Sequence, residues 1–156
     1  MNDDELVQAV KARLESALPA VLAAAGLPPV TEFLDYDPGL PVATKAPQVW
    51  VDLPEDNRSA DSSRGATLQK YSHKPSVMVG VSGAGNNPSL ASRQLRQLVG
   101  HIRQVLEAEP TLGGTVLWVR WIGTSYTPNV SKNPTGLFKL AGLFFDINYR
   151  TRYGQE

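Results

Sequence analysis

Two stretches of the chain carry hydrophobic residues at helical spacing, one near the N-terminus and one past the middle. The first predicts a helix over residues 3–25, whose acidic start suits the positive end of a helix dipole and which Gly26 ends. Pro19 is expected to kink this helix or to start a second short piece. The second predicts a helix over residues 89–108, stopped by Pro110. Their apolar stripes consist of Leu6, Val7, Val10, Leu14, Leu18, Val21 and Leu22, and of Leu95, Leu98, Val99, Ile102, Val105 and Leu106.

Four other segments alternate apolar and polar residues, which predicts strands. Their ranges are 48–53, 75–82, 115–126 and 137–150. In the first of them, Trp50 faces the side opposite Val49 and Val51. The third divides into one face with Leu117, Val119 and Trp121 and another with Val116, Trp118, Arg120 and Ile122. The fourth divides into an inward set, Leu143, Phe145, Ile147 and Tyr149, and an outward set, Phe144, Asp146 and Asn148.

Turn-forming and polar residues fill the segments between these elements. Residues 30–47 are rich in proline and turn signals, residues 54–74 form a polar loop or an extended hairpin arm, and residues 127–136 form a second polar loop. The stretch PTLGG, residues 110–114, reverses the chain tightly because glycine adopts dihedral angles that other residues avoid. The element order α-β-β-α-β-β predicts one α+β domain over residues 1–156. We expect an antiparallel four-stranded sheet with two helices packed on one face and long hairpin arms.

The distribution of charge adds a possible mode of association. The net charge is zero, but residues 1–57 hold 10 acidic and 3 basic side chains, and residues 58–156 hold 12 basic and 5 acidic ones. If these two parts form different surfaces, the molecule is electrically two-sided and could stack, or close into a ring, head to tail. The alternative is that the two parts interleave in the fold and the asymmetry averages out.

No motif in the sequence carries recognisable enzyme chemistry. The chain has no cysteine, which excludes disulfides, thiolate metal ligands and cysteine nucleophiles. VSGAGNNP places G-x-G between a strand and a helix, but Pro88 stands where a dinucleotide-binding fingerprint needs its last glycine. His73 and His101 are the only histidines, and neither has a partner at metal-ligand spacing. A Ser–His–acid triad stays open, although no G-x-S-x-G elbow exists. We therefore expect no catalytic residue, cofactor or metal.

The outward face of the predicted sheet carries aromatic and cationic side chains, namely Trp118, Arg120 and Phe144. Exposed aromatic residues on a sheet face indicate a surface for a partner. The alternative is that residues 127–136 of the same chain cover Trp118. Basic residues of the polar arm could also contact nucleic-acid phosphates, although a basic loop is usually only solvated. The complete candidate interface is Trp118, Arg120, Phe144, Arg93, Arg96, Arg64, Lys70, Tyr71 and Lys74.

Three stretches, together with the order of elements, resemble the tail terminator (tail completion) proteins of long-tailed bacteriophages. They are QVWVDL with the polar arm after it, PSVMVGVSGAG leading into SLASRQLRQLVGHIRQVLEAEPTLGG, and GLFKLAGLFFDINYR. Ile102, Arg103 and Leu106 match the family's I-R-x-x-L helix pattern before a Leu-Gly-Gly-like turn, and Tyr149 and Arg150 match the end of its last strand. The resemblance covers most of the chain, and the polar arm is longer than the pattern needs.

The resemblance implies a structural virion protein without catalysis. Such proteins form a ring, usually of six subunits, which caps the tail tube, ends its polymerisation and presents a docking surface to the head connector. The implied partners are further copies of this chain, the tail tube protein and the head-closure protein, with no membrane and with DNA only where it passes through the ring lumen. The implied location is the tail or neck of the virion, assembled in the host bacterial cytoplasm. The alternatives are another neck, tube or head-closure subunit on the same fold, and a small α+β enzyme or ligand-binding module, which would need a concave pocket.

Overall fold

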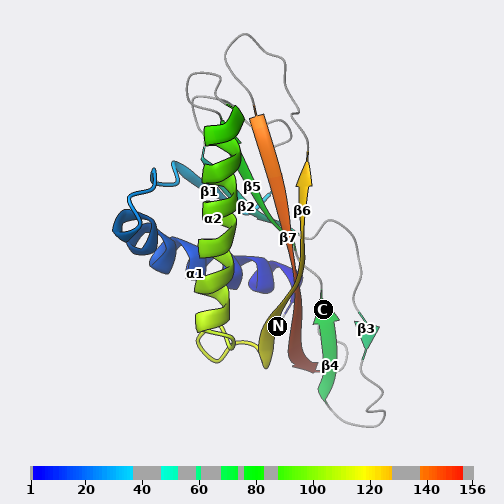
Figure 1. Ribbon diagram of the computed structural model, residues 1–156. Coiled ribbons are helices and arrows are strands. Elements are labelled where there is room, and N and C mark those ends of the chain that lie inside the picture. The colour runs from blue at the N-terminus through cyan, green and yellow to red at the C-terminus, as the bar shows by residue number, and fades with distance from the viewer. Residues whose placement is uncertain are drawn as a thin grey trace.

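The part of the chain that the structure describes folds into two helices and one seven-stranded sheet, in the α+β class that the sequence predicts (Figure 1). The computed structural model describes residues 2–36, 47–52, 59–60, 68–73, 76–82, 88–127 and 138–152. The helices are α1 (Asp3–Ala24) and α2 (Pro88–Ala108). The strands are β1 (Glu32–Leu34), β2 (Gln48–Asp52), β3 (Ser59–Ala60), β4 (Leu68–His73), β5 (Ser76–Ser82), β6 (Trp118–Thr127) and β7 (Phe138–Arg152).

Both helices begin and end close to the predicted residues because local signals define them. In the capping box of α1, the Glu5 backbone N–H donates to Asn2 Oδ1 at 2.8 Å, and the Asn2 backbone N–H donates to the Glu5 carboxylate at 2.9 Å. α1 continues through Pro19 as one helix, so the second short piece considered from the sequence does not form. α2 begins at Pro88, and proline suits a first helical position because no N–H is needed there.

β7 is the central strand of the sheet, 15 residues long, and it has partner strands along both edges. One edge pairs with β6, and the other pairs with β5 along the first part of β7 and with β4 along the last part. β2 and then β1 follow β5, whereas β3 follows β4. The β1–β2 pair is parallel, and the other described pairs are antiparallel.

The predicted four-stranded antiparallel sheet is therefore wrong in its number of strands and in one pairing. β1 and β3 have only three and two residues, too few for an alternating pattern to be recognised in the sequence. β4 reads LQKYSH and lies in the segment expected as a polar arm. β1 pairs with β2, β4 pairs with β7 and β3 pairs with β4, so each of these strands depends on its partner rather than on a pattern of its own. The second predicted polar loop lies outside the described residues from residue 128 onward.

The two helices cross each other on one face of the sheet and share a single hydrophobic core with it (Figure 1). Every residue of the two predicted helical stripes is buried, except Val21, which is half-buried against the core. Trp50 lies on the opposite face of β2 and is also buried. The sheet contributes Val49, Val51, Val119, Ala141, Leu143, Phe145 and Ile147 to the core. The predicted inward and outward sets of β2 and of the central part of β7 are thereby confirmed, while the side chain of Tyr149 is not among the described ones.

The PTLGG stretch reverses the chain between α2 and β6 through three successive left-handed residues. The backbone angle φ is 47° at Leu112, 71° at Gly113 and 86° at Gly114. Glycine adopts such angles readily, whereas the strain at Leu112 is offset by its side chain, which is buried in the core. The Gly114 N–H donates to the Thr111 carbonyl at 3.0 Å and closes the turn. The tight reversal predicted from the sequence is therefore present.

The turn extends further than predicted, and this changes the faces of the residues after it. The alternation placed Leu117 with the inward set and Val116 with the outward set. In the structure Val116 is buried in the core and Leu117 is 39% exposed. The Val116 N–H still donates to the Thr111 carbonyl of the turn at 3.1 Å, so the alternation of a strand applies only from Trp118 onward.

An arginine of α1 reaches the C-terminal end of α2. Arg13 donates to the backbone carbonyl of Val105 from Nε at 3.3 Å and from Nη2 at 3.2 Å. The last turn of α2 contains no basic residue of its own, so Arg13 supplies the cation that a helix C-terminus favours. We expect Arg13→Met to lower the free energy of unfolding by about 1–2 kcal/mol, because it keeps much of the apolar stem and removes both donors. Urea denaturation measures this loss.

Lys11 offers a matched control for Arg13 on the same helix. Its ammonium pairs with Glu15 in an i,i+4 ion pair near the surface. Pairs of this kind contribute roughly 0.3–0.5 kcal/mol, so Lys11→Met should have a clearly smaller effect than Arg13→Met. Equal losses for the two variants would mean that the contact between Arg13 and Val105 does not support the packing of the helices.

Candidate assembly interface

β6 forms a long open edge of the sheet. Nine of its ten residues pair with β7 on one side, and its other side meets no strand within the described ranges. An unpaired edge presents backbone N–H and C=O groups that can bond to another chain, and soluble proteins usually block such edges with lysine, proline or very short strands. β6 reads WVRWIGTSYT, so it contains neither lysine nor proline. As far as the described residues extend, this edge is therefore available to pair with a partner.

The face of β6 that points away from the helices carries a tryptophan, an arginine and a carboxylate in contact. Arg120 Nη2 lies 3.3 Å from Asp146 Oδ2, and the two residues are direct cross-strand neighbours. The guanidinium carbon of Arg120 also lies 5.1 Å from the ring centroid of Trp118. The Arg120 side chain is 68% exposed, whereas the Asp146 side chain is 16% exposed. The charge of Arg120 is thus held over Trp118 and remains accessible to a partner.

The second tryptophan of β6 lies on the helix side, as predicted. Trp121 packs against the core and donates from Nε1 to the Thr124 hydroxyl at 3.0 Å. The Arg103 guanidinium of α2 covers its ring at 3.8 Å from the centroid, and the same group pairs with Glu107 at 3.0 Å. Trp121 therefore joins α2 to β6, while Trp118 on the other face is half-buried. The two tryptophans have different surroundings because a strand turns alternate residues to opposite faces.

The structure divides the predicted interface residues between two layers of the fold. Trp118, Arg120 and Phe144 lie on the sheet face away from the helices, where Phe144 is half-buried. Arg93 and Arg96 are exposed on α2, in the helix layer, and so do not join that cluster. In the β4–β7 ladder the backbone of Lys70 pairs with Arg150 and that of Tyr71 with Tyr149, while their side chains are not among those described. Arg64 and Lys74 lie outside the described residues.

The predicted interface omits two exposed apolar residues of β6, although the alternation already places Ile122 on the outward face. Tyr126 is 49% exposed, and Ile122 is 45% exposed. The register shifts between Trp121 and Gly123, so Ile122 occupies an irregular position of the ladder. A β-bulge of this kind interrupts the alternation on which the predicted faces depended. Gly123, inside the predicted strand, is the signal in the sequence that could have indicated this bulge, because a glycine within a strand often marks one.

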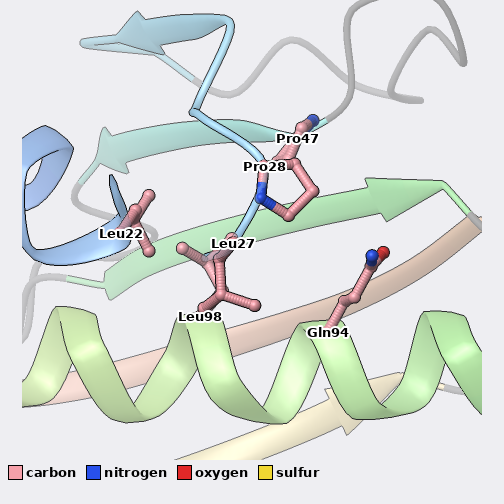
Figure 2. A pocket seen from close by; sticks show the side chains of 6 residues that line it. All are labelled: Leu22, Leu27, Pro28, Pro47, Gln94 and Leu98. Carbon is pink, nitrogen blue, oxygen red and sulfur yellow. The ribbon is translucent and has the colours of Figure 1, made fainter. Parts of the chain in front are cut away.

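A small apolar pocket lies between α1, α2 and the segments that flank β1 and β2 (Figure 2). Leu22 reaches it from α1, and Gln94 and Leu98 reach it from α2. Its cavity of about 10 Å³ corresponds to the space of roughly one water molecule, far below the size of a typical ligand site. The full lining is Leu22, Leu27, Pro28, Pro47, Gln94 and Leu98.

The described ranges hold neither a metal-ligand cluster nor a membrane-spanning helix. No three His, Cys, Asp or Glu side chains lie together there in a way that could hold a metal ion. No helix in that part of the chain is both long and apolar enough to span a bilayer.

Comparison with known proteins finds a likeness in fold. No protein-family model matches the sequence, and no curated protein matches it significantly. Among solved structures, a chain described as "Virion of native gene transfer agent (GTA) particle" is similar, with a TM-score of 0.59 and 16% sequence identity. The similarity covers 94% of this chain and 95% of that one. At this identity the likeness shows a shared fold along nearly the whole of both chains.

Proposed function

We propose that this chain is a structural subunit of a virion and, within that class, a tail terminator that forms a ring of six subunits. The ring caps the tail tube, ends its polymerisation and provides the surface on which the head connector docks. The observation that carries this proposal is the shared fold with a chain of a gene transfer agent virion, which extends over nearly the full length of both chains. The sequence stretches that resemble tail terminator proteins narrow the proposal from virion subunit to terminator.

The features of β6 suit a subunit that works by contact with other proteins. Its open edge and the exposed Arg120 beside Trp118 offer a surface of mixed aromatic and cationic character. Aromatic residues and arginine are enriched in protein interfaces, where burial contributes about 25 cal/mol per Å² of apolar area before the costs of association. The pocket in Figure 2, by contrast, has no room for a substrate. The surface of β6 and the fold shared with a virion chain therefore support a structural role.

The partners in this proposal are copies of the chain itself, the tail tube protein and the head-closure protein. Trp118, Arg120 and Phe144 serve contacts of the sheet face, and Arg93 and Arg96 serve contacts of the helix layer. The basic and aromatic residues of the predicted arm, Arg64, Lys70, Tyr71 and Lys74, are proposed to contact the tube or the connector. The chain then resides in the tail or neck of the virion, after assembly in the bacterial cytoplasm.

The mass of the purified protein in solution tests the proposal. A subunit has a mass of 16.9 kDa. We expect light scattering to give six times this mass, constant over a wide range of concentration, because a ring is a closed assembly. Electron microscopy of the same sample should show rings of one size. A monomer at all concentrations and salt conditions would contradict the ring, and unlimited growth into tubes would favour a tube subunit on the same fold.

A further inference from the structure

The open edge of β6 has a counterpart at the opposite end of the same row of strands. Across the upper half of the sheet in Figure 1, the strand order is β6, β7, β5, β2 and β1. β1 is the last strand of this row, and its side away from β2 meets no strand among residues that the structure describes. Within the described ranges, the two ends of this row are therefore both without a further strand.

The β6 end of this row is basic in its helix layer. Arg103 lies over Trp121, which places this side of α2 beside β6. Arg96 precedes Arg103 by two helical turns and therefore lies along the same side of the helix. Arg93 and Arg96 are exposed, and neither has an ion-pair partner within the described part of the chain. We define the basic edge as Arg93, Arg96 and Arg103 of α2 together with Arg120, Ile122 and Tyr126 of β6. Two of its cations pair with carboxylates, Arg103 with Glu107 and Arg120 with Asp146, whereas Arg93 and Arg96 contribute the excess positive charge.

The β1 end of the row is acidic. Asp35 follows β1 directly and is exposed, and its Oδ2 accepts a hydrogen bond from the neutral Gln8 amide of α1 at 2.7 Å. Asp4 is exposed one turn before Gln8, so both carboxylates lie on the same side of the molecule. Tyr36 stands beside Asp35 and is 54% exposed. The acidic edge, as defined here, comprises Asp4, Glu32, Asp35 and Tyr36.

We propose that the basic edge of one copy binds the acidic edge of the next copy, and that this joint is the subunit contact of the ring. The occupant is a second copy of the chain because both surfaces combine complementary charge with one or two exposed apolar side chains. A contact between two different patches propagates in one rotational sense, as a closed ring requires. The inference rests on the ring that we propose above.

The strand directions are compatible with this joint. β1 runs parallel to β2, and three antiparallel steps then lead from β2 through β5 and β7 to β6. β6 therefore runs opposite to β1. If the neighbouring copy continues the sheet in the same orientation, the strands at the joint are antiparallel, which permits a short ladder along the three residues of β1.

Two charge reversals test the joint without altering the core. Arg96→Glu places a negative charge on the basic edge, and Asp35→Lys places a positive charge on the acidic edge. We expect each variant alone to weaken self-association by about tenfold or more, because like charges then meet at the joint. A mixture of the two variants should associate again if they alternate around the ring. At one joint, the Arg96 kept by the Asp35→Lys variant meets the Asp35 kept by the Arg96→Glu variant. At the next joint, the two introduced charges, negative at position 96 and positive at position 35, meet each other. Ala20→Lys, at an exposed site of α1 away from both edges, is the control and should leave association unchanged.

Engineered cysteines provide a second measurement that depends on geometry rather than charge. The chain has no cysteine, so introduced thiols have no native competitors. Under mild oxidation, a variant with both Tyr36→Cys and Tyr126→Cys should give a ladder of covalent oligomers that ends at the ring size. Each single variant should stay largely monomeric on a denaturing gel. Efficient dimers of the single Tyr126→Cys variant would mean that two β6 edges meet each other, and this would overturn the proposal.

The outcomes separate this inference from the proposed function. If the wild-type chain forms rings but both charge reversals still assemble normally and the cysteine pair does not cross-link, the joint proposed here is wrong while the terminator function stands. If the wild-type chain does not associate under any condition, both are overturned. Assembly that is lost in each single variant and regained in the mixture supports the joint.

Discussion

Phe145→Ala is expected to lower the free energy of unfolding by about 3–5 kcal/mol, the range for removing a fully buried aromatic side chain. Phe145 is 1% exposed and lies in β7, the strand that pairs along both of its edges. Its cross-strand neighbour Trp121 packs against the same core. Because a domain of this size is stable by only about 5–15 kcal/mol, the substitution should remove a large part of the total stability.

Phe144 is the matched control, since it has the same chemistry one position earlier in the same strand. It faces the other side of the sheet and is half-buried. Phe144→Ala should therefore cost clearly less, about 1 kcal/mol, because less apolar area leaves water on folding. Thermal unfolding distinguishes the two, with a shift of about 2–4 °C for each kcal/mol in a domain of this length. Similar shifts for both variants would contradict the assignment of the two faces of β7.

The contrast between these neighbours illustrates which parts of the fold were predictable from sequence. The alternation of apolar residues in β7 assigned Leu143, Phe145 and Ile147 to the core, and all three are at most 1% exposed. The helices were predictable for a similar reason, because a stripe at helical spacing and a cap are both local signals. In these elements, the periodicity of apolar residues in the sequence identifies the side chains that the core buries.

The remaining strands depend on contacts that no local pattern contains. β1 has three residues and pairs in parallel with β2, 16 positions further along the chain. β4 is polar along most of its length and is held by its ladder with β7, which lies more than 70 residues away. A short or polar segment gains its strand conformation from such a partner, so its own sequence gives little indication of it.

The candidate interface was predictable up to the β-bulge. Alternation correctly placed Trp118 and Arg120 opposite Trp121, and this separation follows from the pleat alone. After Trp121 the register shifts. Ile122, which the alternation places in the outward set, is exposed, and so is Tyr126, which no predicted set includes. The edge itself is a property of the whole sheet, since it depends on which strands are absent beside β6. Residue spacing within one strand cannot reveal it.

The glycines of the PTLGG turn lead to the second large effect, which is conformational. We expect the double variant Gly113→Ala, Gly114→Ala to lose about 2–4 kcal/mol of unfolding free energy, from about 1–2 kcal/mol at each left-handed position. An added Cβ at either site meets no atom within 4 Å, so steric overlap does not contribute. The loss comes from φ angles of 71° and 86°, which an L-residue with a side chain rarely adopts. Urea denaturation at low protein concentration measures it.

Gly100 is the control for this prediction, because it has the same open surroundings but a helical backbone conformation. It lies inside α2, is exposed, and an added Cβ there also meets nothing within 4 Å. Gly100→Ala should therefore raise the unfolding free energy by about 0.5–1 kcal/mol, since alanine loses less conformational freedom in a helix. If alanine at positions 100, 113 and 114 instead changes the unfolding free energy in the same direction, the turn does not hold its glycines at positive φ. If alanine lowers the unfolding free energy in the turn and raises it at Gly100, the difference comes from the backbone angle, because all three sites are equally open. The two glycines between α2 and β6 are then explained by the positive φ angles of the turn.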